Sequence, residues 1–77
     1  MIANEYEQGP QPIAGLMTKH NLKPHDLVAA STEQITHKMV SRACRGRKLS
    51  RRVQLKITNA LNAATEQNYK LKDCFTY

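Results

Sequence analysis

A dense cluster of cationic side chains gives this sequence its clearest chemical signal. Residues 31–56 contain eight Lys and Arg residues against one acid, Glu33, which makes a net charge of +7. The whole chain of 77 residues has a net charge of +6, so this segment accounts for the entire excess. Charge that is concentrated in one segment attracts a polyanion such as nucleic acid or an acidic membrane. The eight cations are Lys38, Arg42, Arg45, Arg47, Lys48, Arg51, Arg52 and Lys56.

Residue types that often carry catalysis or bind metals are present but dispersed. The six acids form no pair suited to general acid–base work, and no serine lies in a nucleophile motif such as Gly-x-Ser-x-Gly. Cys44 and Cys74 belong to no Cys-x-x-Cys pair and have no histidine at metal-ligand spacing. We therefore expect no enzyme activity, no catalytic residues, no metal site, no cofactor and no small-molecule substrate.

The segment at residues 32–45 separates apolar from polar side chains when it is drawn as a helix. At about 100° per residue, its apolar side chains fall in one sector. The facing sector carries hydrogen-bonding and cationic groups and no acid. One side is therefore expected to face the core and the other to face solvent or a ligand. The apolar sector consists of Ile35, Met39, Val40 and Ala43.

The two ends of this helix differ in how well the sequence defines them. Gly46 is a natural C′ residue, because glycine adopts a positive φ at little cost, so the helix is expected to end there. The start has two candidates. Ser31 and Gln34 have the spacing of a capping box, whereas Thr36 would cap a helix that begins later.

A helix with this polar face suits the major groove of double-stranded DNA. Its diameter with side chains, about 10–12 Å, fits a groove about 12 Å wide. Beyond it, the free N–H groups at the start of the next helix would add to a phosphate site. We assign base-reading contacts to Gln34, His37, Lys38, Ser41 and Arg42. We assign phosphate contacts to Arg45, Arg47, Lys48, Ser50, Arg51 and Arg52.

Helical periodicity extends to both sides of this segment. Ile13 begins a first helix that should end near residues 20–21, and Pro24 is placed to open a second, short one. Ser50 is the N-cap candidate of a fourth helix, whose apolar residues repeat up to Ala64, and residues 71–75 form a closing turn. No alternating run or hairpin dipeptide predicts a strand. We expect an all-α fold, a small bundle of four to five short helices.

The chain should contain one folded domain. Residues 1–12 have few apolar side chains and two prolines, which predicts a flexible N-terminal arm, and residues 13–77 form the domain. The first residues lack the basic start and apolar stretch of a signal peptide. No apolar run approaches the roughly 18 residues of a membrane span. We therefore expect a cytoplasmic protein with no membrane partner.

Three stretches carry a resemblance to a known family. They are residues 40–46 (VSRACRG), residues 55–61 (LKITNAL) and residues 71–75 (LKDCF). They resemble the helix-turn-helix domain of the Cro/phage-repressor family, also called lambda-repressor-like, over roughly residues 13–76. The resemblance implies a helix-turn-helix within the bundle, sequence-specific binding of double-stranded DNA by a small transcriptional regulator, and a homodimer on two half-sites.

Other functions stay open on the same residues. An RNA- or ribosome-associated basic protein would normally carry exposed aromatic residues near its cations, and here the few aromatics lie toward the ends of the chain. A protein-interaction module would bind an acidic partner through the cationic face. A membrane-surface helix is the weakest alternative, because the apolar sector of residues 32–45 lacks Trp, Phe and Leu.

Overall fold

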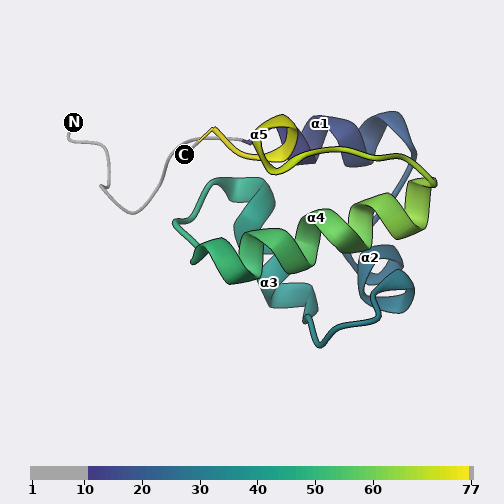
Figure 1. Cartoon of the computed structure of the whole chain (residues 1–77), viewed down its shortest axis with the longest axis horizontal. Helices are drawn as coiled ribbons and strands as arrows, with labels where there is room; N and C mark the ends of the chain where they lie inside the picture. The colour runs from purple at the N-terminus through teal and green to yellow at the C-terminus, as the bar shows by residue number, and fades with distance from the viewer. Residues whose placement is uncertain (1–10, 77) are drawn as a thin grey trace.

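The computed structural model describes residues 11–76 as five α-helices, with no strand among these residues. In Figure 1 the longest helix, α4, runs through the middle of the view, with α1 and α5 along one side, α2 on the other and α3 crossing it. Contacts join α4 to α2, α3 and α5, and α3 also packs against α1 and α2. The prediction of a small all-α bundle is confirmed. The helices are α1 (Pro12–Lys19), α2 (Pro24–Ala30), α3 (His37–Arg45), α4 (Arg51–Thr65) and α5 (Leu71–Cys74).

Helices α2 and α4 begin where the sequence indicated, and α1 begins at Pro12, one residue before the expected Ile13. Pro12 and Pro24 are the first residues of α1 and α2, where proline's missing N–H has no partner to lose. Ser50 caps α4, because its Oγ accepts a hydrogen bond from the backbone N–H of Val53 at 3.3 Å. These starts depend on local chemistry within one turn.

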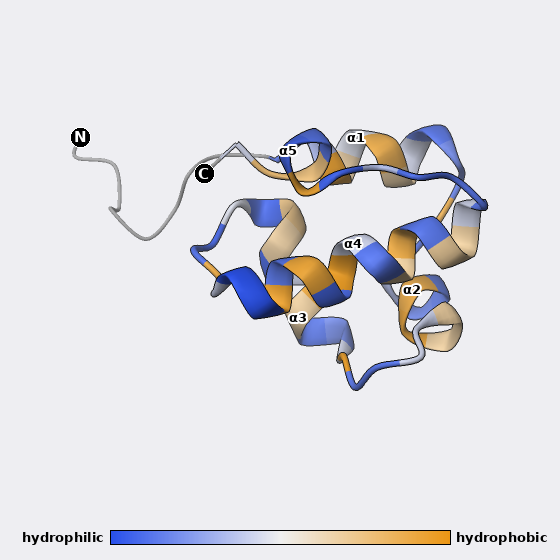
Figure 2. Cartoon of the chain, viewed as in Figure 1, coloured by the Kyte–Doolittle hydropathy of each residue, from blue (hydrophilic) through white to orange (hydrophobic). Residues whose placement is uncertain are grey.

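The core lies between the five helices, with α4 packed on α2, α3 and α5 and α1 packed on α3 and α5. Leu27 is the one buried residue of α2, and Val40 and Ala43 are the buried residues of α3. Figure 2 shows orange bands along α4 and a deep blue first turn in the same helix, which begins with Arg51 and Arg52. The buried apolar side chains are Ile13, Met17, Leu27, Ile35, Val40, Ala43, Ile57, Ala60, Leu61, Cys74 and Phe75.

A buried glutamine joins the two ends of the described chain. The Gln11 Oε1 atom accepts hydrogen bonds from the backbone N–H of Thr76 at 2.7 Å and from its hydroxyl at 3.0 Å. The Gln11 backbone N–H donates to the carbonyl of Cys44 at 3.3 Å. Of the expected arm, residues 1–10 lie outside the described residues. Gln11 and Pro12, which the sequence placed in that arm, instead belong to the fold.

Candidate nucleic-acid interface

Helix α3 presents most of the expected base-reading residues on its outer side. His37, Lys38 and Arg42 are exposed, and Ser41 is half-buried. Val40 and Ala43, on the opposite side of the same helix, are fully buried and fix its rotation against the core. The rotation of α3 therefore follows from the separation of its apolar and polar side chains.

Gln34 lies outside the helix on which the sequence placed it. The helix begins at His37 rather than near residue 32, because Thr36 Oγ1 accepts the backbone N–H of Met39 at 3.1 Å and caps it. Ser31, the other N-cap candidate, forms hydrogen bonds with Glu33 instead. Its Oγ donates to the Glu33 carbonyl at 2.7 Å and accepts the Glu33 N–H at 3.0 Å. This local turn competes with helix formation. Gln34 is exposed in the connection between α2 and α3.

The expected phosphate-binding residues lie at the end of α3, in the connecting loop and at the start of α4. Figure 1 shows that the loop returns the chain from the end of α3 to the first turn of α4. Within this group Arg47 is half-buried, and the others are exposed. The start of α4 adds free backbone N–H groups and the positive end of the helix dipole. The exposed members are Arg45, Lys48, Ser50, Arg51 and Arg52.

Few acids lie near this cationic surface in the part of the chain that the structure describes. No Asp or Glu occurs from residue 34 to residue 65. The ion pair found among the described residues joins His25 to Asp26 at 3.4 Å, outside the cationic segment. Apart from Arg47, no cation of the segment lies within ion-pair distance of a described carboxylate. Such a surface attracts an anionic ligand over a long range.

Gly46 controls the direction in which the chain leaves α3. Its φ of 85° is left-handed. Its N–H donates to the carbonyl of Ala43 at 3.2 Å, while the N–H of Arg47 donates to that of Arg42 at 3.0 Å. This pair of bonds is a Schellman motif, in which glycine is favoured because it has no Cβ.

Replacing Gly46 with alanine should lower the free energy of unfolding by about 1–2 kcal/mol. In the left-handed region the Cβ of an L-residue comes too close to the following carbonyl oxygen, which destabilises the conformation by that amount. Gly15→Ala is the matched control. Gly15 lies in α1, where an added Cβ meets no atom within 4 Å, so that variant should gain roughly 0.5–1 kcal/mol from the higher helix propensity of alanine. Urea denaturation of both variants checks the prediction. Equal effects at the two positions would contradict it.

The structure brings together one pair of residues that the sequence did not single out as neighbours. The rings of His25, in α2, and His37, at the start of α3, have centroids 6.4 Å apart. They are twelve positions apart in the chain, and no local pattern indicates their contact. The pair places the beginning of α2 beside the beginning of α3. The connection between these helices spans residues 31–36, six residues, where a helix-turn-helix has three to four.

Several described residues have side chains of the types that bind metals. No three side chains among their His, Cys, Asp and Glu residues come together as metal ligands. Cys44 and Cys74 are free thiols, and burial raises the pKa of both, since it disfavours the charged thiolate. No described helix has the length and apolar character needed to cross a bilayer.

No family model, no curated protein and no solved structure matches this chain.

Proposed function

We propose that this protein binds double-stranded DNA sequence-specifically and acts as a small transcriptional regulator in the cytoplasm. The observation that carries the proposal is the cationic surface formed by α3 and the start of α4, whose Lys and Arg side chains on these two helices have no ion-pair partner among the described carboxylates. No acid interrupts it from residue 34 to residue 65. The resemblance to the Cro/phage-repressor family supports the same function.

In this proposal α3 enters the major groove. It has nine residues, about 14 Å at 1.5 Å per residue, and its width of about 10–12 Å fits the groove. Lys38 and Arg42 are exposed on one side of the helix, where they reach base edges. Arginine is suited to this role because it binds the O6 and N7 atoms of guanine in a bidentate manner. His37, Ser41 and Gln34 contact neighbouring bases or sugars.

The end of α3 and the start of α4 hold the phosphates. Ser50 Oγ accepts the N–H of Val53, so its hydroxyl proton is left to donate to a phosphate oxygen. The side chains that neutralise phosphate charge are Arg45, Arg47, Lys48, Arg51 and Arg52. A second copy of the chain, bound as a homodimer to a half-site about 34–36 Å away, would double the number of contacts.

Selection of a random DNA duplex library with the purified chain tests the proposal. Enriched duplexes should share a motif, and their affinity should fall steeply with salt. Five cations on phosphates predict a slope of log K against log salt of about −4 to −5 per protomer, at about 0.9 per contact.

Three results, from this selection and from matched binding measurements with single-stranded RNA and an acidic protein, would oppose the proposal. An unenriched library with a steep salt slope would indicate non-specific binding. Tighter binding to single-stranded RNA would favour the RNA-associated alternative. A flat salt slope together with retained binding to an acidic protein would favour the interaction module.

A further inference from the structure

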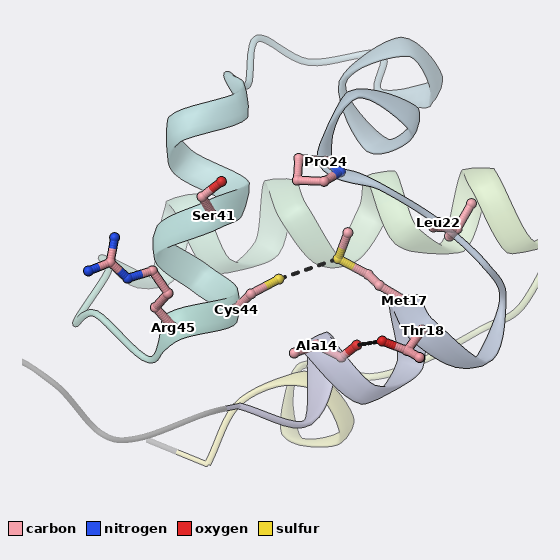
Figure 3. Close-up of a pocket in the computed structure, with 8 residues that line it drawn as sticks. All are labelled: Ala14, Met17, Thr18, Leu22, Pro24, Ser41, Cys44 and Arg45. Carbon is pink, nitrogen blue, oxygen red and sulfur yellow. Dashed lines mark hydrogen bonds between the residues drawn. The ribbon is translucent and has the colours of Figure 1, made fainter.

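A second feature of α3 lies on the side that faces α1. A cavity of about 350 Å³ opens there between α1, the start of α2 and α3. Figure 3 shows that side chains from all three segments surround it. Its lining is largely aliphatic, with two sulfur atoms, two hydroxyl groups and one guanidinium. The lining residues are Ala14, Met17, Thr18, Leu22, Pro24, Ser41, Cys44 and Arg45.

The two sulfur atoms in this cavity are paired. Cys44 Sγ, from α3, donates a hydrogen bond to Met17 Sδ, from α1, at 3.4 Å. Figure 3 shows the two side chains pointing toward each other, while Arg45 extends away from them. Met17 is only 4% exposed and Cys44 is half-buried. Both residues line the open cavity, which is the side from which an ion would approach the pair.

We propose that Cys44 and Met17 form a binding site for a soft monovalent metal ion, Cu⁺, for which Ag⁺ is a redox-inert substitute. Thiolate and thioether sulfur are the protein ligands that select Cu⁺. On binding, the Cys44 thiol releases its proton to solvent, the thiolate sulfur bonds to the ion, and the Met17 thioether donates a lone pair to it. No electron is transferred in this step.

The charges favour a monovalent ion over a divalent one. A thiolate and Cu⁺ form a neutral unit, so little charge is placed among the aliphatic side chains around it. Zn²⁺ would leave one uncompensated positive charge, and it requires four ligands where this cavity offers two sulfurs. Among the described residues no acid lines the cavity to supply the missing charge.

The geometry requires only a small adjustment. With metal–sulfur bonds of about 2.3 Å, two sulfurs on opposite sides of an ion lie about 4.6 Å apart. The present separation is 3.4 Å, so the sulfurs must move apart by about 1 Å. Methionine has three rotatable side-chain bonds and adapts readily to such changes. The adjacent cavity leaves room for the movement.

The ligands of this site have no role in the proposed function, because Cys44 and Met17 are not assigned to DNA, although the neighbouring Ser41 and Arg45 line the cavity and are assigned to it. The test of this site therefore uses no DNA. Affinity for Cu⁺ is measured without oxygen, by competition with a chromogenic Cu⁺ chelator, in the wild type and three variants of the full chain. The variants are Cys44→Ser, Met17→Leu and Cys74→Ser.

Cys44→Ser should abolish binding at this site, and Met17→Leu should weaken it by about 10- to 100-fold, the range seen when a metal site loses even an outer partner. Cys74→Ser is the matched control, because it removes the fully buried second thiol and should leave affinity unchanged. Unchanged affinity in Met17→Leu would show that the thiol binds alone and would overturn the proposal. Loss of binding in Cys74→Ser with retention in Cys44→Ser would also overturn it.

A second measurement does not depend on any variant being folded. With ¹³C-labelled methionine methyl groups, Ag⁺ should shift the NMR signal of Met17 by coordinating its sulfur. Met39, half-buried on α3 and absent from the cavity lining, serves as the internal control. A Met17 signal that does not move on Ag⁺ binding, or moves no more than that of Met39, would overturn the proposal.

Discussion

Replacing Leu27 with alanine should lower the free energy of unfolding by about 3–5 kcal/mol, the range for a leucine removed from a rigid core. Leu27 is 0% exposed and is the one buried residue of α2. A helix of seven residues is too short to be stable by itself, so α2 depends on this contact for its place beside α4. The free energy of unfolding of native proteins is about 0.05–0.15 kcal/mol per residue, which gives about 4–12 kcal/mol in total for a chain of this length. The variant should therefore lose a large part of its stability.

Leu55→Ala provides the matched control for this prediction. It is the same chemical change on α4, at a side chain that is 45% exposed, and should alter stability by no more than about 0.5 kcal/mol. Urea denaturation followed by far-UV circular dichroism measures both variants. An equal loss of unfolding free energy in Leu27→Ala and Leu55→Ala would contradict the packing of α2 against the core.

Removing Arg42 and removing Arg51 should weaken DNA binding in two different ways. Arg42 is exposed on α3, and the proposed function places it at base edges. Arg42→Ala should therefore weaken the free energy of binding by about 1–3 kcal/mol on the selected site and by much less on random duplex. Arg51 is exposed in the first turn of α4, where the proposed function places a phosphate. Arg51→Ala should weaken all sequences about equally and make the salt slope shallower by about one.

Lys70→Ala is the control for charge alone. It removes one exposed cation from the chain between α4 and α5, outside the cationic segment, and should leave the affinity and salt slope nearly unchanged. Fluorescence anisotropy across a salt series, on the selected site and on random duplex, separates the three variants. Equal changes in affinity and salt slope for Arg42→Ala and Arg51→Ala, on both duplexes, would contradict the assignment of base contacts to one arginine and phosphate contacts to the other.

The elements of this fold follow from signals that act within a few residues. Pro24 and Ser50 mark helix starts because their effects involve only the first turn. Gly46 marks the end of α3 because the left-handed turn requires φ near 85°, which glycine adopts without steric cost. The alternation of apolar and cationic residues in α3 likewise predicted which side is buried. These features were determined by the sequence alone.

The start of α3 was decided by a competition between local alternatives. Both Ser31 and Thr36 are suitable N-cap residues. The structure settles on Thr36 because Ser31 forms a turn with Glu33, and this choice moves Gln34 out of the helix. The burial of Ile35, 8% exposed just before the cap, also depends on the core that the other helices provide. The local turn at Ser31 and the tertiary burial of Ile35 together favour Thr36 over a cap of similar strength.

The contacts between distant segments came from the tertiary structure only. Gln11 resembles an arm residue in the sequence, yet it is buried because Thr76, 65 positions away, supplies the donors for its Oε1 atom. Met17 and Cys44 look like two unrelated apolar residues, and packing of α1 on α3 brings their sulfurs to 3.4 Å. Helix periodicity determines which side of each helix is buried. Helix periodicity does not determine which other helix, or which of its atoms, packs against that side. Those pairings form only when all the helices pack around one core.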